Sequence, residues 1–341
     1  MFKSLLKNAF RNITHKFAYS FLNVLGMTLG ITSALFLILY VSDELSFDRY
    51  HENADHIYRV QSHINEPDDE FTWIATQFPF IPQVVEDYPE IESGTRIFNF
   101  QRALFRYQDQ EHTEEDVYYA DSTFFEIFTH KVLEGSTAGA LDKPHSIVLT
   151  KTMANRYFNP GEAVGKDLEV GDELYSVTAV IEDVPANSHI LFDGMVSSNS
   201  LPPEIGSWGG FAVYAYIMLR DGEDAVQLQE KMKEMYERYM ATIFENLGIS
   251  IEYELMKITD IHLRSDNPGE PRPTGSIQYV IIFSIVAFFL ILIATLNYIN
   301  LATARSAKRA KEISLRKVIG SSRRLLITQF LTESTPVSYT H

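Results

Sequence analysis

The segment His51–His56 (HENADH) brings two imidazoles and two carboxylates together, and these are side chains that can bind zinc. In zinc proteases of the H-E-x-x-H type the two histidines lie at i and i+4, on one face of a helix. Here the i+4 residue is Asp55, and His56 lies about 100° further round the helix. We therefore expect a solvated helix that continues out of the preceding apolar segment, and no catalytic zinc.

A second pattern, formed by Gly161, Gly165 and Lys166, resembles a phosphate-binding loop. The spacing between the two glycines is one residue shorter than in G-x-x-x-x-G-K-[ST]. Asp167 also replaces the Ser or Thr whose hydroxyl would bind magnesium. The sequence thus predicts that the chain does not bind ATP through this loop.

Other catalytic signatures are missing from the sequence. It contains no cysteine, which excludes thiol nucleophiles, thiolate metal sites and iron–sulfur clusters. It also lacks the G-x-S-x-G elbow of serine hydrolases. We predict a non-catalytic protein with no cofactor and no metal of its own.

The charges are sorted along the 341 residues, which carry a net charge of -16. Residues 1–20 carry +4 and residues 305–341 carry +6, whereas residues 43–275 carry -26. The basic residues thus lie next to uncharged segments, while most of the chain is acidic. This distribution argues against binding of nucleic acid.

Two uncharged segments, residues 17–42 and 276–304, separate the basic ends from the acidic middle. Each is longer than the roughly 20 residues that cross a hydrocarbon core, so both are predicted transmembrane helices. The first is too long for the apolar core of a signal peptide, and no A-x-A cleavage site follows it. Because Lys and Arg are retained on the cytoplasmic side, we expect both termini in the cytoplasm and residues 43–275 outside it.

Ahead of the first span, a helix over residues 2–17 would place large apolar side chains on one side and Lys3, Lys7 and Arg11 on the adjoining side. Such a helix, taken as residues 1–16, is predicted to lie on an anionic membrane surface. The alternative is that it extends the first span into the cytosol.

Small and amide side chains in the two spans indicate helix packing. Gly26 and Gly30 form a G-x-x-x-G pair, which would let another helix approach closely. Asn297 and Asn300 place amides within the second span, where they need polar partners on a neighbouring helix. We expect these spans to contact each other or further membrane helices.

The exported region alternates strand and helix patterns, which predicts an α+β domain. Strands are expected at 57–64, 91–100, 213–219 and 249–258, and a helix at 78–88. A second helix from about residue 223 would bury one apolar stripe and end at Gly248. The stripe comprises Leu228, Met232, Met235, Tyr239, Ile243 and Leu247.

Strand–helix–strand units at both ends of this region suggest one lobe built from residues 43–100 and 206–275. The intervening residues 101–205 contain alternating strands at 146–150 and 175–181, separated by Pro, Gly and Asn. We expect them to form a second, mostly β lobe that is inserted into the first.

Several motifs resemble MacB-type permeases of ABC transporters, which have an FtsX-like membrane domain. They include residues 6–12 (LKNAFRN), 23–30 (NVLGMTLG), 43–48 (DELSFD), 119–121 (YAD), 124–128 (FFEIF), 147–150 (IVLT) and 187–189 (NSH). The likeness is sharpest at residues 297–306 (NYINLATARS) and 311–320 (KEISLRKVIG). It covers nearly the whole chain, including both predicted spans.

This resemblance implies an inner-membrane permease subunit that transmits motion from a cytoplasmic ABC ATPase to a two-lobed periplasmic domain and drives efflux or export. ATP would bind to the partner ATPase. The segment after the second span would dock on that ATPase as a coupling helix, within residues 305–341. This is about residues 310–320, in which Glu312, Arg316, Lys317 and Gly320 match the family motif. The apolar residues of the same stretch are Ile313, Leu315 and Val318. The apolar members would seat in a groove while the charges steer docking; a lipid-surface helix is the alternative.

The resemblance also implies further partners: a second permease copy or half, a periplasmic adaptor and an outer-membrane channel. Members of this type continue into a third and a fourth span, whereas residues 335–341 depart from the family pattern. We therefore expect a polypeptide truncated before those spans. A rival hypothesis is a membrane-anchored sensor or scaffold that activates a cell-wall hydrolase, since two spans around an exported domain also describe receptors.

Overall fold

The computed structural model describes residues 2–100, 102–202, 206–267 and 269–318. It describes only the backbone of residues 2–20, 22, 23, 301 and 304–318. The chain divides into two compact units. The first contains two long helices, and the second comprises Ser42–Ile277.

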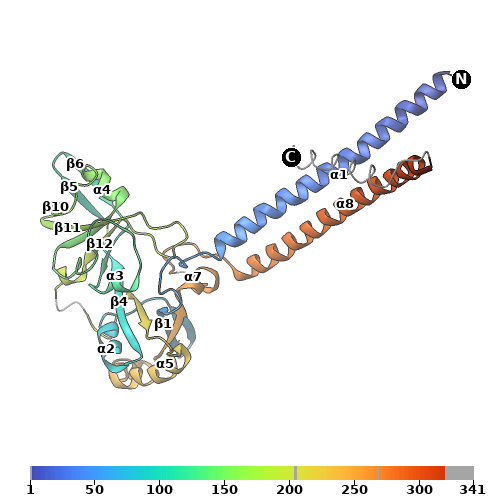
Figure 1. Cartoon of the computed structure of the whole chain (residues 1–341). Coiled ribbons are helices and arrows are strands. Elements are labelled where there is room, and N and C mark those ends of the chain that lie inside the picture. Colours follow the sequence, from blue (N-terminus) through green and yellow to red (C-terminus); the bar gives the residue numbers. More distant parts are fainter. Residues whose placement is uncertain (1, 101, 203–205, 268, 319–341) are drawn as a thin grey trace. The chain divides into compact units, whose positions relative to one another are not determined.

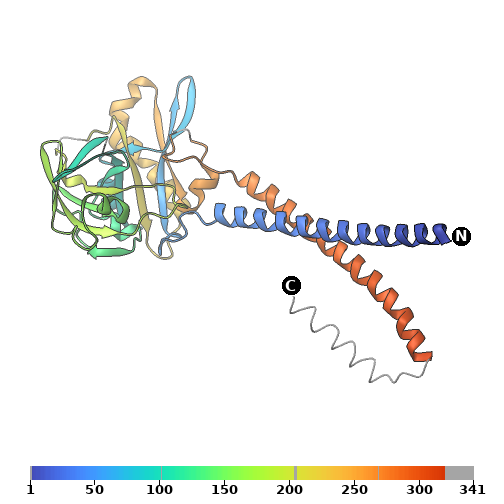
Figure 2. The ribbon, with the colours of Figure 1, turned by 90° about the horizontal axis from the view of Figure 1, so that it is seen from above.

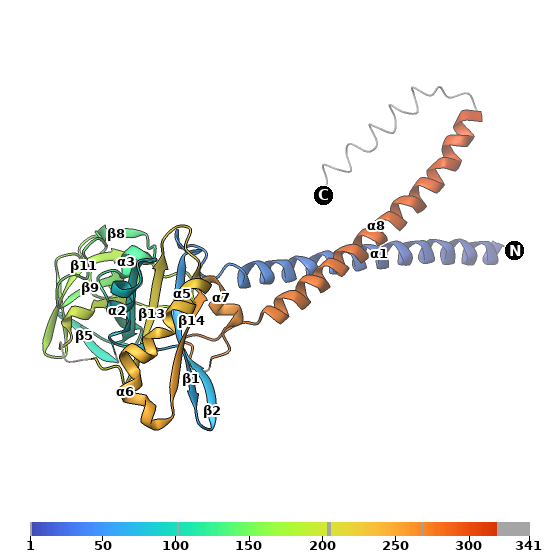
Figure 3. The same ribbon diagram turned by 90° about the horizontal axis from the view of Figure 1, so that it is seen from below.

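The helical unit consists of α1 (Phe2–Glu44) and α8 (Ile277–Val318). Their segments Val24–Glu44 and Ile277–Asn300 are long and apolar enough to cross a membrane. The helices run antiparallel, cross, and then separate toward the N-terminal end of α1 and the C-terminal end of α8 (Figures 2 and 3). Tyr40 and Phe283 pack edge-to-face, with ring centroids 5.4 Å apart.

Both helices extend beyond the apolar segments without a break. The predicted surface helix at 1–16 and the first span are joined in α1, as the extended-span alternative requires. Likewise α8 continues from the second span through Val318, into the predicted coupling segment. The location of the N-terminal segment on a membrane surface stays a prediction.

The second unit, Ser42–Ile277, is built on one large sheet (Figure 1). Its strands are β1 (Ile57–Glu66), β2 (Asp69–Trp73), β3 (Thr76–Gln77), β4 (Ile91–Asn99), β5 (Ala103–Tyr107), β6 (Gln110–Glu114), β7 (Val117–Ala120), β8 (Val132–Gly135), β9 (Ser146–Thr150), β10 (Asp167–Val170), β11 (Glu173–Ile181), β12 (Gly194–Ser197), β13 (Phe211–Leu219) and β14 (Ser250–Lys257). Their order is β14-β1-β13-β4-β7-β12-β9-β11-β10-β5-β6, with β2 on β1, β3 on β13 and β8 on β11. Only the β7–β12 and β9–β11 pairs among these are parallel.

Strand order groups the predicted lobes at opposite ends of this sheet. Strands from 43–100 and 206–275 form one end, and strands from 101–205 form the other. The two ends are joined by the antiparallel β4–β7 pair, and residues of both contribute to one apolar core that contains Ile97, Phe124 and Ile258. The domain is therefore one mixed α/β body with a continuous sheet, and its division into two lobes stays a prediction.

Short helices flank the sheet. They are α2 (Phe80–Asp87), α3 (Phe124–Ile127), α4 (Lys151–Tyr157), the 3₁₀ turn η1 (Ser198–Ser200), α5 (Ala225–Met232), the π turn η2 (Tyr236–Met240), α6 (Ala241–Phe244), the 3₁₀ turn η3 (Glu245–Leu247) and α7 (Ile258–Arg264). Gly248 ends the helical segment that begins with α5, and it adopts the left-handed conformation with φ 70°, as predicted. Strands occur at all the predicted positions, and α2 matches the predicted helix at 78–88.

The buried stripe of the predicted helix after residue 223 is wrong in its second half. Leu228, Met232 and Met235 are buried, but Ile243 is 43% and Leu247 is 61% exposed. Met240 and Phe244 are buried in their place. The π turn adds one residue to a helical turn, which rotates the following residues relative to the core.

Candidate functional site

Three segments meet where the chain enters and leaves the unit Ser42–Ile277, and we call their meeting point the junction. They are residues 43–51, which follow α1; residues 186–189, a loop between β11 and β12; and residues 262–276, which lead into α8. The first and third segments connect the domain to the two apolar helices.

Asp48 is the centre of the first segment, and its side chain is completely buried. Its backbone N–H donates to the carbonyl of Asn187 at 2.9 Å. Its carboxylate accepts from Ser188 Oγ at 3.1 Å and from the His189 N–H at 3.1 Å, and it lies 2.9 Å from His189 Nδ1. Asp48 has a φ of 57°, a left-handed conformation that is costly for a residue other than glycine. These contacts hold the strained turn in place.

The 186–189 loop also binds the first segment through side chains. Asn187 Nδ2 donates to the carbonyl and to the hydroxyl of Ser46, at 3.1 and 2.9 Å. The Tyr50 hydroxyl donates to Ser188 Oγ at 3.2 Å. The Ser46 N–H and hydroxyl both donate to the carbonyl of Asp43, which tightens the turn at the end of α1.

The same loop binds the segment that leads into α8. One guanidinium nitrogen of Arg272, Nη1, donates to the carbonyls of Ala186 and Ser188 at 2.6 and 2.7 Å. A single loop therefore holds both chain segments that connect to the membrane helices. We call this arrangement the clasp.

A buried ion pair fixes the third segment to the sheet. Arg59 in β1 donates to both carboxylate oxygens of Glu270, at 2.7 and 2.6 Å. Their side chains are 1% and 6% exposed. Ser265 also donates to Glu270. Removing one partner of such a buried bidentate pair strongly destabilises the folded protein, because the other charge is left buried without a partner.

The two segments also touch each other directly. Glu44 Oε2 lies 3.0 Å from His262 Nε2, and Phe47 stacks on the His262 ring with centroids 3.4 Å apart. The Gly275 N–H donates to the carbonyl of His262 at 2.8 Å. A Cβ at position 275 would collide with the Glu44 carboxylate and lie 2.9 Å from His262 Nε2, so a larger residue there would displace the Glu44–His262 contact.

The Asp48–His189 contact continues to Tyr216 of β13, whose hydroxyl lies 2.8 Å from His189 Nε2. This series resembles the order of groups in a hydrolase triad, with Ser188 nearby. However, Asp48, Ser188 and Tyr216 are at most 1% exposed, and Ser188 donates to Asp48 instead of to His189. No substrate could reach these atoms, and the network positions the loop.

Burial and hydrogen bonding shift the pKa values of titratable side chains in and near the junction. Burial alone would raise the pKa of Asp48, but the charge and hydrogen bonds of His189 outweigh it and lower that pKa below its ordinary value. Burial lowers the pKa of His51 to about 4 and that of His130 to about 3. The two imidazole centroids are 5.9 Å apart, and both rings are neutral near pH 7.

The predicted helix through His51–His56 is not present, because α1 ends at Glu44 and turns follow. His51 is buried, with 4% exposure, and its Nδ1 accepts from the Thr129 N–H at 3.1 Å. His56 instead lies 3.5 Å from Asp221 near the surface. Within the described residues, no group of three or more His, Asp or Glu is placed to bind a metal ion.

Comparison with known proteins decides the family. The description "MacB-like periplasmic core domain" matches residues 20–235, well over half of the chain, and "FtsX-like permease C-terminal" matches residues 284–340. The chain belongs to the MacB/FtsX-like permease family. Family membership and the two apolar helices indicate an inner-membrane protein with a periplasmic domain.

Individual relatives are distant. The uncharacterized ABC transporter permease YvrN of Bacillus subtilis (strain 168) is 23% identical over 64% of this chain. The chain spans about half (53%) of that protein. A crystal structure of a permease-protein domain from Porphyromonas gingivalis has a TM-score of 0.55 and 22% identity, and covers 62% of this chain and 92% of that chain. The periplasmic region of MacB from Actinobacillus actinomycetemcomitans has a TM-score of 0.43 and 11% identity, over 61% and 91% of the two chains.

The glycine-rich loop of the permease at 161–166 binds a carboxylate of the same chain, that of Glu134. The N–H groups of Gly161 and Ala163 donate to the two carboxylate oxygens of Glu134, at 2.8 and 3.3 Å. Gly161 and Gly165 adopt φ of 83° and 80°. The loop thus forms an anion-binding turn for an internal carboxylate, which accounts for its likeness to a phosphate loop.

The predicted packing residues of the permease's spans lie partly together. A Cβ on Gly26 would be 3.9 Å from Asn297 Nδ2, and a Cβ on Gly30 would be 3.7 Å from the Ala294 Cβ. Asn300 is exposed on α8 and does not face these glycines. Packing of a further helix against Asn300 stays a prediction.

Most predicted coupling residues lie on the described backbone of α8. Glu312, Ile313, Leu315, Arg316, Lys317 and Val318 belong to its last turns, and Gly320 lies outside the described residues. Sequence analysis singled out 43–48 and 187–189 as family motifs but did not predict that they meet. It missed Arg272, Arg59, Glu270, His262 and Gly275, since no local pattern marks them.

Proposed function

We propose that this chain is the permease subunit of an ABC-type transporter, in which motion of a cytoplasmic ATPase is transmitted to the periplasmic domain and drives efflux or export of a periplasmic substrate. Both termini would lie in the cytoplasm. ATP would be bound and hydrolysed by the partner, which docks on the coupling segment at 311–320. A second permease copy or half would complete the membrane part, and an adaptor and an outer-membrane channel would extend the path.

The clasp is the observation that carries this proposal. One loop holds the segment after α1 through Asp48 and Ser46, and the segment before α8 through Arg272. The hydrogen bonds of Asp48 are buried, those between Asn187 and Ser46 are partly buried, and those of Arg272 lie partly or fully at the surface. Separating the segments would therefore leave above all the buried Asp48 carboxylate unpaired. A displacement of either helix end would therefore move the loop, which leads directly into β12 at the centre of the sheet. A sensor or scaffold role has no comparable support among the described residues.

Docking is tested by affinity capture of the full-length protein from its native membranes. We expect an ABC ATPase to be captured, and Arg316→Glu to reduce its recovery at least tenfold, because the charge reversal disrupts docking. Lys308→Glu is the matched control: it reverses a charge in the same basic segment but outside the 311–320 motif. Absence of an ATPase from the wild-type capture, or equal loss with both variants, would contradict the proposal.

Transmission is tested by hydrogen–deuterium exchange on the captured complex, with and without ATP. We expect ATP to change exchange in residues 186–189 and 265–276, but little in β11. Arg272→Ala should keep the ATPase bound and reduce the ATP effect in residues 186–189, because one segment is released from the loop. ATP that leaves exchange unchanged throughout the periplasmic domain would rule out transmission.

A further inference from the structure

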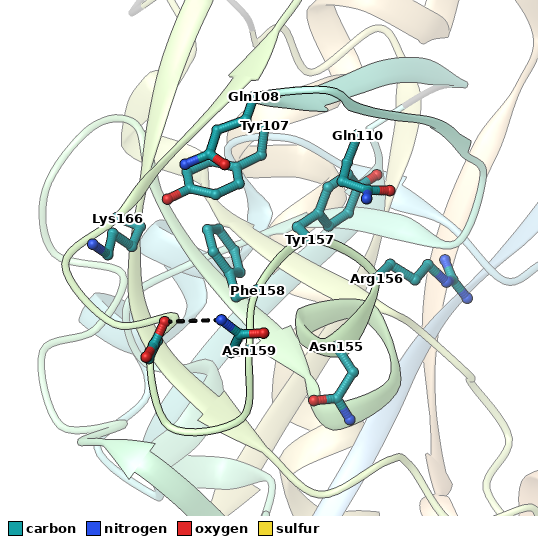
Figure 4. A pocket seen from close by; sticks show the side chains of 10 residues that line it. Tyr107, Gln108, Gln110, Asn155, Arg156, Tyr157, Phe158, Asn159 and Lys166 are labelled. Atoms are coloured by element: carbon teal, nitrogen blue, oxygen red, sulfur yellow. Dashed lines mark hydrogen bonds between the residues drawn. The ribbon is translucent and has the colours of Figure 1, made fainter.

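A cavity of about 310 Å³ lies at the opposite end of the sheet order from β14 and β1. It is open to solvent and lined by the β5–β6 turn, the C-terminal end of α4 and the loop that follows α4 (Figure 4). This volume is at the lower end of the range for small-ligand sites, about 300 to 1,000 Å³. Neither the clasp nor the coupling segment contributes to it.

Aromatic side chains form the floor of this cavity. The rings of Tyr107 and Phe158 pack with centroids 4.5 Å apart, and Tyr157 lies beside them (Figure 4). Tyr157 and Phe158 are 5% and 7% exposed, and the Tyr157 hydroxyl donates to Glu114. The floor is therefore rigid, and Tyr107 is its more exposed member.

Carboxamides form the rim. Gln108 and Gln110 come from the β5–β6 turn, and Asn155 and Asn159 come from the opposite side (Figure 4). Among the described residues, the amides of Gln108, Gln110 and Asn155 make no side-chain hydrogen bond, and Asn159 donates to Glu162 at 3.3 Å. Each free carboxamide offers two donors and one acceptor oxygen to a ligand.

The charged side chains that line the cavity do not favour an ionic ligand, because Arg156 is paired while Glu162 and Lys166 carry opposite charges. The Arg156 guanidinium is bound to Glu114 and lies 2.9 Å from Asp193. In Figure 4, Arg156 and Lys166 extend away from the space between Tyr107 and Asn159. The last carbonyls of α4 also present partial negative charge on this side. The ligand that fits is neutral and rich in groups that both donate and accept.

Gln108 has an unusual backbone that supports a binding role. Its φ is 53°, in the left-handed region, within a two-residue hairpin turn where Asn or Gly would be favoured. A strained conformation of a residue other than glycine is often retained because its side chain is needed there. Gln108 and Tyr107 both line the cavity on the same side of Figure 4.

We propose that this cavity binds a neutral sugar ring of a saccharide. The C–H face of a sugar ring packs on aromatic side chains, and its hydroxyls donate to and accept from carboxamides. Tyr107 would contact the ring face, while Gln108, Gln110 and Asn155 would bind its hydroxyls. The permease would thereby contact a glycan or a glycosylated substrate.

The test uses the full chain in phosphatidylcholine nanodiscs, which contain no sugar headgroups. Saturation-transfer difference NMR and calorimetry would measure binding of two neutral probes, tri-N-acetylglucosamine and maltotriose, and of two anions, glucuronate and inorganic phosphate. We expect at least one neutral saccharide to bind. Tyr107→Ala should weaken its binding about tenfold or more through loss of the ring contact. Absence of binding by both neutral probes, or binding of the anions alone, would overturn the proposal.

Gln108→Gly separates binding from folding. Glycine relieves the left-handed strain, so the melting temperature should stay or rise, while binding weakens about 2- to 10-fold because an amide is lost. Gln108→Asn keeps a carboxamide and tolerates this φ, and it should bind better than the glycine variant. His145→Gly is the matched control, since His145 has a φ of 55° and lies outside the cavity. Equal saccharide affinity in wild type and Gln108→Gly would also overturn the proposal.

Discussion

Asp48 and His51 show how two titratable side chains only three positions apart serve the junction in different protonation states. Asp48 is held charged by two donors from the 186–189 loop and by the His189 imidazole 2.9 Å away, although it is completely buried. His51 is held neutral because burial lowers its pKa to about 4 and its Nδ1 accepts a backbone hydrogen bond. The junction thus depends on an ionised Asp48 carboxylate and on a neutral His51 imidazole.

Removing the charge of Asp48 should loosen the clasp. We expect Asp48→Asn to destabilise the full-length protein by about 3 kcal/mol, because His189 and Ser188 would lose a buried charged acceptor. Thermal unfolding followed by circular dichroism measures this. Asp172→Asn changes an exposed carboxylate on the same domain and should leave the melting temperature within about 1 °C. Equal melting temperatures for wild type and Asp48→Asn would show that the contacts carry no stability.

His51 should make stability depend on pH. Its pKa is about 4 in the folded protein and near 6.5 in the unfolded chain, so below about pH 6.5 protons bind preferentially to the unfolded chain. Stability should fall as the pH decreases from about 6.5 to 4, by up to about 3 kcal/mol, and His130 should add to the loss in the same direction. His51→Asn keeps an acceptor for Thr129 and should show a shallower decrease. Parallel melting-temperature profiles for the two proteins would contradict this assignment.

At the scale of elements, the π turn Tyr236–Met240 decides which side chains of its helical segment are buried. The sequence stripe through Tyr239, Ile243 and Leu247 follows an uninterrupted α-helix, whereas one extra residue per turn moves Met240 and Phe244 inward. Trp208 stacks on Tyr239 with centroids 4.9 Å apart, so part of the displaced stripe is covered by another loop.

Substitution of Met240 should therefore destabilise the protein more than substitution of Ile243, whereas the stripe predicted from the sequence would give the reverse order. Met240→Ala removes a fully buried side chain and should destabilise the protein by about 2 to 5 kcal/mol. Ile243→Ala truncates a side chain that is 43% exposed and should cost less than about 1 kcal/mol. Melting temperatures of the two variants distinguish the faces, and a larger effect of Ile243→Ala would mean that the uninterrupted helix is correct.

At the scale of the whole molecule, the charge distribution predicts the orientation of the chain, and the clasp holds together the two segments that connect the acidic domain to the apolar helices. Basic ends flank the apolar helices and an acidic domain lies between them, which predicts that both ends stay on the cytoplasmic side. The clasp then lies at the base of the exported domain, where both connecting segments are held by one loop.

The absence of cysteine allows this orientation to be tested cleanly, because a single introduced thiol is the only one that reacts. In spheroplasts, a membrane-impermeant maleimide should label Asp172→Cys, which lies on the exported domain. Lys308→Cys should be labelled only after permeabilisation, because its basic segment is retained inside. The reverse labelling pattern would invert the orientation and remove the basis for cytoplasmic ATPase docking.

The sequence by itself determined features that depend on composition and local periodicity. Spans, short strands, the stop at Gly248 and the family motifs all follow from residues that are near one another in the chain, so their physical cause is visible in a short window. Residues 43–48 and 187–189 stood out in this way. The contact between these two segments could not be predicted from the sequence, because the hydrogen bond between Asp48 and His189 joins positions that are 141 residues apart.

Only the tertiary structure decided the junction, the rotated helical face and the cavity beside Tyr107. Arg272 and Glu270 look like ordinary surface residues in the sequence. The burial of Glu270 and the contact of Arg272 with the 186–189 loop depend on where the chain returns toward α8. The π turn is a local change in hydrogen bonding that competes closely with the α-helix, so core packing selects it. Long-range contacts and small differences between local conformations are settled by the packing of the whole domain, which no short stretch of sequence contains.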